Sequence, residues 1–246
     1  MTTLKNKVAI VTGSSKGIGA QIAILLAEAG AKTVINYAND DAAANDIVSQ
    51  IKSAGGEAIA VQADVSDTQQ VATLFDTTIS EFGKPDILVN SAGIMINKPI
   101  AETTDEDFDR IFSINVKGTF NTLRAAATKL NNGGRIVNLS STTTRMMLPA
   151  YGTYCATKGA VEQLTRIFSK EVGERNITVN AVSPGPTDTE LFNQGKADET
   201  IENLAGMSPF NRIGEPIDIA RVVSFLVSEE AAWVTGQNIG ANGGIA

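Results

Sequence analysis

Residues 7–19 read KVAIVTGSSKGIG, and this stretch decides the fold class. Its first half, Lys7–Thr12, is a short apolar run rich in β-branched residues, which predicts a buried strand. Its second half holds three glycines, and the helical spacing of apolar residues in Gly17–Ala29 predicts a helix directly after the turn. A strand, a glycine turn and a helix in this order form the first unit of a parallel α/β sheet.

The rest of the chain repeats this alternation. Further strands are predicted over Lys32–Tyr37, Glu57–Gln62, Asp86–Asn90, Arg135–Leu139, Thr178–Val182 and around Gln237–Ile239. Further helices are predicted over Asp41–Ser53, Val71–Phe82, Asp107–Leu130, Tyr154–Val172 and Pro216–Val227. Because the strands are largely apolar, the pattern predicts a doubly wound, Rossmann-like parallel sheet covered by helices on both faces.

No stretch rich in Pro, Gly or Ser divides the chain, so we expect residues 1–246 to form a single domain. The one irregular region is Pro184–Gly214, which holds several prolines and scattered polar residues. Long loops in compact domains usually act as lids or binding loops, so we expect a substrate lid around residues 186–214. A surface excursion without a function is the alternative.

Composition excludes several classes of partner. The net charge of -7 and a pI near 4.7 argue against nucleic acid as a general partner, which needs a basic surface. No apolar run is long enough to span a bilayer, so no membrane association is expected. The chain starts without a secretory signal and has one cysteine, Cys155, so we expect no internal disulfide and a cytoplasmic location.

The chain contains no histidine. This excludes Ser-His-Asp and Cys-His nucleophiles as well as zinc sites with histidine ligands, and no metal site is expected. It also removes the only side chain whose unperturbed pKa lies near neutrality. Acid–base chemistry must therefore use a group whose pKa is shifted by its neighbours.

Tyr154 and Lys158 are candidates for that chemistry. They stand four residues apart on a predicted helix and therefore project from the same face. A nearby ammonium stabilises tyrosinate, so we expect Lys158 to lower the pKa of Tyr154. The alternatives for the two residues are a packing tyrosine and a lysine that extends its amine to solvent.

Two further polar residues complete this group. Ser141 follows the predicted strand Arg135–Leu139 and is placed to hydrogen-bond a substrate carbonyl. Asn115 interrupts an apolar helix, where a buried amide needs partners, and a water leading to Lys158 would be one. Ser141 also has a purely structural interpretation, as a cap of a turn at the end of a strand.

The glycine turn predicts a binding site for the pyrophosphate of a dinucleotide. Helix N-termini favour anions, and glycine permits close approach. The spacing is G-x-x-x-G-x-G, and the residues expected in contact are Gly13, Ser15, Lys16, Gly17, Ile18 and Gly19. A tight turn that serves packing alone is the alternative.

The ends of the third and fourth predicted strands lie at the same edge of the sheet, where doubly wound folds bind ligands. Asp64, followed by Val65, is placed to accept the adenine amino group. Asn90, Ala92 and Gly93 follow the fourth strand. Asp64 as a helix cap and Asn90 as a turn residue are the alternatives.

The end of the second strand bears on the choice between NAD and NADP. NAD-binding proteins usually place an acid there to bind the ribose 2′-OH, but this chain has Asn36, followed by Tyr37. Lys16 adds a cation for a 2′-phosphate. We therefore expect NADP(H), although Asp40 and Asp41 lie close behind, and we expect Asn36→Asp to move the preference toward NADH.

These motifs resemble the short-chain dehydrogenase/reductase family over essentially the full chain. The match covers TGSSKGIG, ADV, NSAG, the tetrad Asn115-Ser141-Tyr154-Lys158 and the Pro184-Gly185 that follows ITVNAVS. The resemblance implies a nicotinamide-dependent oxidoreductase in which Tyr154 protonates a carbonyl oxygen that Ser141 orients. It implies that Lys158 binds the nicotinamide ribose and that Asn115 holds a relay water. Pro184, Gly185, Thr187 and Thr189 would frame the nicotinamide, and the two long helices would pair in a homotetramer.

Within the family, the stretch Arg166–Gly185 most resembles fungal polyhydroxynaphthalene reductases, ketone reductases and their bacterial relatives. The close alternative is a 3-oxoacyl-carrier-protein reductase, for which Arg175 matches one of two usual arginines while Asn132 replaces the other. The chain departs from the family pattern at NSAG, usually NNAG, and at Ala241-Asn242-Gly243-Gly244, often V-D-G-G.

The sequence therefore predicts an NADPH-dependent carbonyl reductase for a small-molecule ketone or aldehyde with apolar substituents. Its substrate pocket is expected to be lined by Ile94, Met146, Met147, Leu148, Tyr151, Leu191, Phe192 and Met207. An alternative of another class is a catalytically silent NADP-binding sensor or scaffold. That alternative predicts an eroded tetrad, whereas this tetrad is complete.

Overall fold

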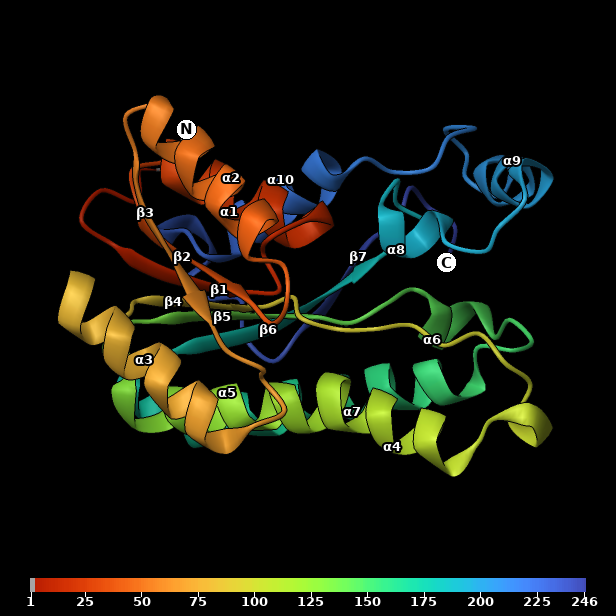
Figure 1. Cartoon of the computed structure of the whole chain (residues 1–246), viewed down its shortest axis with the longest axis horizontal. Coiled ribbons are helices and arrows are strands. Elements are labelled where there is room, and N and C mark those ends of the chain that lie inside the picture. The colour runs from red at the N-terminus through yellow and green to blue at the C-terminus, as the bar shows by residue number, and fades with distance from the viewer. Residues whose placement is uncertain (1–2) are drawn as a thin grey trace.

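Seven parallel strands form one sheet in the computed structural model, which describes residues 3–246 (Figure 1). They are β1 (Val8–Thr12), β2 (Lys32–Tyr37), β3 (Glu57–Gln62), β4 (Ile87–Asn90), β5 (Arg135–Leu139), β6 (Thr178–Pro184) and β7 (Asn238–Ala241). Their order is β3-β2-β1-β4-β5-β6-β7. From β1 the chain adds strands toward one edge of the sheet, and from β4 it adds them toward the other edge, so the order of the strands reverses between β1 and β4. This confirms the predicted doubly wound fold.

Helices cover both faces of the sheet (Figure 1). One layer holds α1 (Gly17–Glu28), α2 (Asp41–Ser53) and α10 (Pro216–Leu226), and the other holds α3 (Thr68–Phe82), α4 (Asp105–Phe112), α5 (Gly118–Lys129) and α7 (Gly152–Glu171). Three short helices, α6 (Thr143–Met146), α8 (Glu190–Asn193) and α9 (Asp198–Gly206), lie near the carboxyl edge of the sheet. None of the helices within residues 3–246 is long and apolar enough to cross a membrane.

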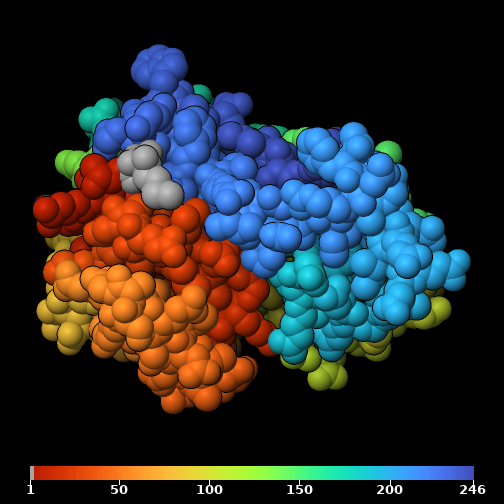
Figure 2. Space-filling view, turned by 90° about the horizontal axis from the view of Figure 1, so that it is seen from above, coloured from red at the N-terminus to blue at the C-terminus, as the bar shows by residue number. Residues whose placement is uncertain are grey.

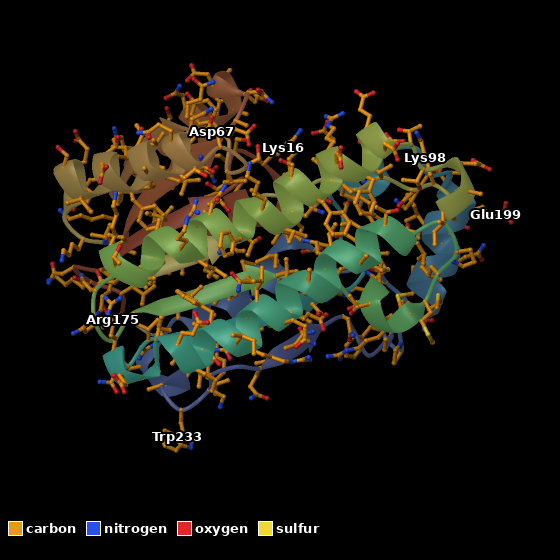
Figure 3. The ribbon with its side chains drawn as sticks, turned by 90° about the horizontal axis from the view of Figure 1, so that it is seen from below. Lys16, Asp67, Lys98, Arg175, Glu199 and Trp233 are labelled. Carbon is orange, nitrogen blue, oxygen red and sulfur yellow. The ribbon has the colours of Figure 1, made fainter. Side chains whose placement is uncertain are left out.

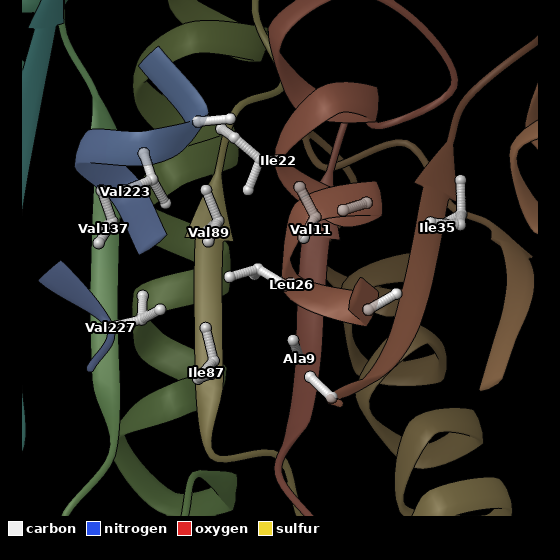
Figure 4. Close-up of a cluster of buried hydrophobic side chains, with 14 of the residues drawn as sticks. Ala9, Val11, Ile22, Leu26, Ile35, Ile87, Val89, Val137, Val223 and Val227 are labelled. Atoms are coloured by element: carbon white, nitrogen blue, oxygen red, sulfur yellow. The ribbon is translucent and has the colours of Figure 1, made fainter. Parts of the chain in front are cut away.

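The apolar character of β1 has a direct cause, because both of its faces are buried. Val11 packs in one core cluster with Ile22 of α1 and Val223 of α10 (Figure 4). Ile10, on the opposite face, packs in a second cluster with residues of α3 and α5, such as Leu74. Burying a strand on both faces requires a nearly continuous apolar run, and this is why residues 7–12 signal the fold so clearly.

Helices α3, α4 and α7 begin two or three residues earlier than predicted. In α3 and α4 the reason is a cap that precedes the apolar pattern. The Asp67 side chain accepts hydrogen bonds from two N–H groups in the first turn of α3, which starts at Thr68. Thr104 caps α4, which starts at Asp105. Side-chain caps satisfy orphan N–H groups and therefore set helix starts upstream of the apolar residues.

The predicted helix Asp107–Leu130 is not continuous. A turn of π-helix, Ser113–Lys117, separates α4 from α5 and contains Asn115. Turns of this kind interrupt α-helices most often at functional sites. The irregular region 186–214 also contains more structure than expected, namely α8 and α9. Their four and nine residues are too short for the helical periodicity of a sequence to stand out.

Candidate active site

The glycine turn between β1 and α1 is closely packed against the end of β4. Gly13 has a φ of +60°, and a Cβ atom on it would lie 2.7 Å from the Cα of Ala92. A Cβ on Gly19 would lie 2.5 Å from the carbonyl oxygen of Gly13. The Thr12 hydroxyl accepts the N–H groups of Ser91 and Ala92, each at 3.1 Å, and so fixes the two strand ends together.

The N-terminus of α1 is open. Its N-cap residue, Lys16, makes no capping side-chain hydrogen bond, and its first turn holds no acidic residue. By contrast, α2, α3 and α4 are capped by Asp40, Asp67 and Thr104. An uncapped helix start leaves N–H groups for an anion, so this turn fits the pyrophosphate of a dinucleotide.

Tyr154 and Lys158 project from the first half of α7 toward the ends of β5 and β6. The Lys158 ammonium donates to the carbonyl oxygen of Leu139 at 2.8 Å. Within residues 3–246 this is the one protein hydrogen bond recorded for the ammonium, which has three donors, and the remaining donors fit the hydroxyls of a bound ribose. A Cβ on Gly93 would lie 3.6 Å from the Lys158 nitrogen, so the end of β4 closes over it.

The pKa values in this group differ from the sequence-based expectation. Burial raises the pKa of Tyr154 to about 12, and a hydrogen bond with Ser141 partly offsets the rise. Burial lowers the pKa of Lys158 to about 8. The ammonium lies 5.6 Å from the centroid of the tyrosine ring. Burial outweighs this neighbour, so the lowered pKa expected for Tyr154 is not found in the protein without ligands. Tyr154 is therefore protonated at neutral pH, as a general acid must be.

The Asn115 side chain is buried and bonded within the protein through both its nitrogen and its oxygen. Its amide nitrogen donates to the Ile94 carbonyl at 2.9 Å and to the Thr157 hydroxyl at 3.1 Å. Its oxygen accepts the Ile94 N–H at 2.8 Å. These protein partners account for three hydrogen bonds of the amide, and the relay water that the family resemblance implies at Asn115 stays a prediction. The side chain links the π-turn to the segment after β4 and to α7.

One cavity of about 410 Å³ joins the glycine turn to the tyrosine. Of the predicted catalytic and cofactor residues, its lining includes Gly13, Ser15, Lys16, Ile18, Gly19, Ala92, Gly93, Ser141, Tyr154, Lys158, Pro184, Gly185, Thr187 and Thr189. Of the predicted substrate pocket, it includes Ile94, Met146, Leu148, Tyr151, Leu191 and Phe192. In Figure 2 the segment that carries α8 and α9, in cyan and light blue, lies beside the red and orange N-terminal half.

Several predicted residues lie outside this lining. They are Gly17, Asn36, Tyr37, Asp64, Val65, Asn90, Asn115, Met147 and Met207. Met147 is 84% exposed and Met207 is 49% exposed, so neither lines the cavity as predicted. The Asp64 carboxylate accepts the N–H of Ser66 at 2.8 Å and is only partly buried. The Tyr37 hydroxyl donates to Asp41 at 2.5 Å.

Asn90 faces the protein interior. Its side-chain nitrogen donates to the oxygen of Asn138 at 2.8 Å, and its oxygen accepts the hydroxyl of Thr122 at 2.7 Å. Asn138 in turn donates to Thr165 of α7 at 2.8 Å. This buried chain of polar groups ties α5, β4, β5 and α7 together, so the Asn90 side chain holds the frame of the site and does not face a ligand.

Asn36 also faces inward, contrary to its predicted role. Its amide nitrogen donates to the carbonyl oxygens of Val61, at 3.3 Å, and Ala63, at 2.9 Å. Its amide oxygen accepts the N–H of Gly13 at 3.3 Å. The side chain therefore joins the glycine turn to β3 and is not placed to select a ribose hydroxyl.

Asn36→Asp is accordingly expected to destabilise the fold and not to switch the cofactor. An aspartate would place a buried carboxylate against two carbonyl oxygens, which we expect to lower the free energy of unfolding by about 2 kcal/mol or more. Thermal unfolding should show a Tm lowered by roughly 4–8 °C. Asn39→Asp, which adds the same charge at an exposed position nearby, is the control. A variant with the Tm of the wild type and a preference for NADH would restore the original interpretation.

Lys16 contacts the short helix α8. Its ammonium lies 2.7 Å from the carboxylate of Glu190, and both side chains are largely exposed. An exposed pair of this kind contributes little to stability and exchanges partners readily. The pair joins the glycine turn to a segment that lines the cavity. The sequence gives no signal for this contact because 174 residues separate its members.

The cavity also contains residues absent from the prediction. They are Ser91, Met95, Leu139, Ser140, Thr142, Thr143, Pro186, Glu190, Gln194 and Leu204. Extending each predicted motif by two residues along the chain identifies all of these except Leu204, which belongs to α9. Within residues 3–246, no cluster of three or more Cys, Asp or Glu side chains is placed to hold a metal ion.

The sequence matches a known family model and known proteins over almost its whole length. Residues 13–246 match the model described as enoyl-(acyl carrier protein) reductase. An NADPH-dependent aldehyde reductase-like protein, described as chloroplastic, from Arabidopsis thaliana is 47% identical over 98% of this chain and 94% of that protein. The short chain dehydrogenase/reductase dmxR18 from Cryptosporiopsis sp. is 46% identical over 99% of this chain and 97% of that protein.

A solved structure agrees with these matches. The angucycline C-6 ketoreductase LanV with bound NADP has a TM-score of 0.94 to this chain. It is 41% identical in sequence, and the alignment covers 99% of this chain and 97% of LanV. These findings confirm the resemblance drawn from the motifs. The chain belongs to the short-chain dehydrogenase/reductase family and is an oxidoreductase.

Proposed function

We propose that this protein is an NADPH-dependent carbonyl reductase for small ketones or aldehydes. The observation that carries the proposal is that a protonated Tyr154, Ser141 and Lys158 line the same cavity as the open N-terminus of α1. One cavity thus offers an acid for a carbonyl oxygen and a site for a dinucleotide. The bound NADP of the ketoreductase LanV supports both the cofactor and the reaction class.

The cofactor NADP(H) also agrees with the charges around the site. The NADPH-dependent relative from Arabidopsis thaliana supports it. Lys16 is the cation we assign to the 2′-phosphate, since it stands at the start of α1 and its exposed partner Glu190 is readily exchanged. When bound, the nicotinamide supplies the hydride for the carbonyl carbon.

The protein's own residues then have distinct tasks in reduction. The Tyr154 hydroxyl gives its proton to the carbonyl oxygen as negative charge develops there. The Ser141 hydroxyl hydrogen-bonds the same oxygen and orients it. Lys158, held by the Leu139 carbonyl, binds the ribose and adds a positive charge that stabilises Tyr154 after it has lost its proton.

The remaining walls of the cavity suit an apolar substrate. Ile94, Met146, Leu148 and Phe192 surround the tyrosine end, and methionine adapts to irregular shapes. The segment 186–214 is proposed as the lid. Its helix α8 is joined to the glycine turn by the Lys16–Glu190 pair, and a Cβ on Gly17 would lie 3.4 Å from the Thr189 methyl group. Closure at this point would exclude water from the reacting atoms.

Reduction of 3-oxoacyl groups on a carrier protein is the second candidate. The description of the matched family model supports a carrier-bound substrate, but it names an enoyl group, whose C=C bond is reduced, and not a 3-oxoacyl group. The structure gives Arg175 another task, because its guanidinium donates to the Asn132 side chain at 2.9 Å and to the carbonyl oxygens of Ala127 and Leu130 near the end of α5. Figure 3 shows Arg175 at the opposite end of the molecule from Glu199 of α9, the helix whose Leu204 lines the cavity. An arginine committed to a helix end is a poor anchor for a carrier protein.

A substrate screen tests the proposal. With NADPH, we expect aryl ketones and apolar aldehydes to be reduced at least tenfold more efficiently, as kcat/KM, than a 3-oxoacyl thioester. Efficient reduction of the thioester alone would favour the carrier-protein reading. Binding of NADPH without turnover of any carbonyl would favour the silent sensor or scaffold.

A cytoplasmic location remains part of the proposal. It rests on the single cysteine of the sequence, because a reducing compartment leaves thiols free. The relative from Arabidopsis thaliana is described as chloroplastic, so members of this family also work inside organelles. Fluorescence of a tagged full-length chain in its own cells decides between the two locations.

A homotetramer is proposed from the exposed apolar face of α4, α5 and α7. These helices form a groove lined by Phe112, Val116, Phe120, Leu164 and Ile167. Ile167 is 60% exposed and Phe120 45% exposed, and a contiguous apolar patch of this kind marks an interaction site. A second copy of the same helices would cover both, since twofold contacts pair identical surfaces.

Sedimentation at micromolar concentration should therefore give a mass well above the 25.8 kDa of one chain. Ile167→Glu should shift the population to smaller species, because it places a charge in the centre of the contact. Lys170→Glu, an exposed change on the same helix, serves as its control. A stable, active monomer of the wild type would contradict the tetramer.

A further inference from the structure

The Ser141 hydroxyl has an unusual set of partners. Its oxygen accepts two hydrogen bonds from one residue, Thr143: one from the N–H at 3.2 Å and one from the side-chain hydroxyl at 2.9 Å. A serine hydroxyl has two acceptor positions and one proton. Both acceptor positions are therefore filled, and the proton is the only part of the group left to interact.

That proton is directed toward Tyr154. The hydrogen bond between Ser141 and Tyr154 lowers the pKa of the tyrosine, which means that it favours the ionised phenolic oxygen. Because Thr143 fills both acceptor positions of the serine oxygen, Ser141 can take part in this contact only as the donor. The three hydroxyls thus form a chain in one direction, from Thr143 to Ser141 to the tyrosine oxygen.

The segment that carries Thr143 is anchored from behind. Glu162 of α7 accepts the hydroxyls of Ser140, at 2.8 Å, and Thr144, at 3.0 Å, on either side of the serine. The N–H of Thr142 donates to the Pro184 carbonyl at 2.9 Å. These contacts hold α6 in place, so the direction of the hydroxyl chain is fixed before a substrate arrives.

We propose that Thr143 is a positioning residue that makes Ser141 a dedicated hydrogen-bond donor to the substrate carbonyl. By filling the acceptor positions of the serine, Thr143 prevents its hydroxyl from turning to accept a bond. It also polarises the serine O–H bond, since hydrogen bonds in a chain strengthen one another. This inference rests on the proposed carbonyl reduction and names a residue of the same site.

Thr143→Val tests the inference, because valine keeps the shape and the N–H but lacks the hydroxyl. We expect kcat for reduction to fall about fivefold to tenfold, as the loss of one hydrogen bond predicts, while KM for NADPH stays unchanged. Thr143→Ser should recover kcat to within about twofold of the wild type. Thr144→Val removes, from the same short helix, a hydroxyl that donates to the Ser141 backbone carbonyl and to Glu162 but not to the Ser141 hydroxyl. Because Ser140 and the Thr142 N–H still anchor the segment, it should lower kcat by less than about twofold.

A double-variant cycle separates positioning from a merely structural role. If Thr143 acts through Ser141, Thr143→Val should cost nothing further in a Ser141→Ala background. The inference is overturned if Thr143→Val keeps the kcat of the wild type, if Thr144→Val loses as much, or if the loss persists in the Ser141→Ala background. If the wild type reduces carbonyls and Thr143→Val has the same kcat, the inference fails while the proposed function stands. A wild type that reduces no carbonyl defeats the proposed function, and the inference with it.

Discussion

Tyr154→Phe should bind NADPH almost normally and yet reduce carbonyls about 100 to 10,000 times more slowly, the range that one positioned acid supplies. Phenylalanine keeps the ring, so the packing against Tyr151, whose ring centroid lies 6.5 Å away, is preserved. What is lost is a hydroxyl that is protonated at neutral pH, since burial raises its pKa further above neutrality, from 10.0 to about 12. Steady-state kcat with a ketone from the substrate screen, together with a binding titration of NADPH, measures both effects.

Tyr151→Phe is the matched control. It removes the same hydroxyl from a second tyrosine that lines the same cavity, and it should keep most of the turnover because its oxygen has no place in the proton transfer. A Tyr154→Phe variant that retains more than a tenth of the wild-type rate would remove Tyr154 from the role of acid. Equal losses in both tyrosine variants would point to packing, and not to proton donation.

The sequence predicts the frame of this site better than its details. The strand β1 and the glycine turn are readable because strong physical constraints act on single residues there. A side chain at Gly13 or Gly19 would collide with backbone atoms, and β1 is buried on both faces. Tyr154 and Lys158 are readable because four residues make one turn of a helix, so sequence spacing alone sets their common direction.

The inward-facing asparagines mark the limit of such predictions. Asn36 and Asn90 both lie at the ligand edge of the sheet, as predicted, but a position on a strand does not fix what a side chain bonds to. Asn36 bonds to β3 and Asn90 to the residue beside it on β5, and both partners are settled only when the strands pair. The direction of an amide at a strand end depends on tertiary contacts that no local pattern encodes.

The pKa of Tyr154 is a second property that the sequence does not predict. A lysine one turn from a tyrosine predicts a lowered tyrosine pKa, yet burial outweighs the neighbour in this site. The lysine is itself desolvated, and its ammonium lies 5.6 Å from the centroid of the tyrosine ring. Spacing predicts that the two residues are close, whereas the sign of the shift depends on how much water the fold leaves around them.

Lys158→Met should lower kcat about 100-fold, raise KM for NADPH about tenfold and at the same time stabilise the fold at neutral pH. The kinetic losses follow from two tasks, since the ammonium binds the ribose and stabilises the ionised tyrosine. The gain in stability follows from burial, which lowers the pKa of Lys158 from 10.5 to about 8. Below pH 8 the folded protein carries this charge at a cost on the order of 3 kcal/mol.

The gain in stability of Lys158→Met over the wild type is expected to depend on pH. Between about pH 8 and 10.5 the unfolded chain holds a proton that the folded protein has released, so the cost to the wild type fades as pH rises through this window. Methionine removes the charge but leaves the Leu139 carbonyl without its hydrogen-bond donor. This loss reduces the gain in the free energy of unfolding by roughly 1 kcal/mol. The Tm of the variant should therefore exceed that of the wild type by several degrees at pH 7 and lose this advantage near pH 10.

Lys170→Met, an exposed change near the end of the same helix, controls for the loss of a lysine and should alter neither kcat nor the pH dependence of Tm. A Lys158→Met variant with a raised KM for NADPH and an unchanged kcat would limit the lysine to ribose binding. A variant less stable than the wild type at pH 7 would show that the ammonium is solvated by water in the free protein. Loss of activity together with a gain in stability is the combination expected only if a desolvated charge is kept in this site for its chemistry.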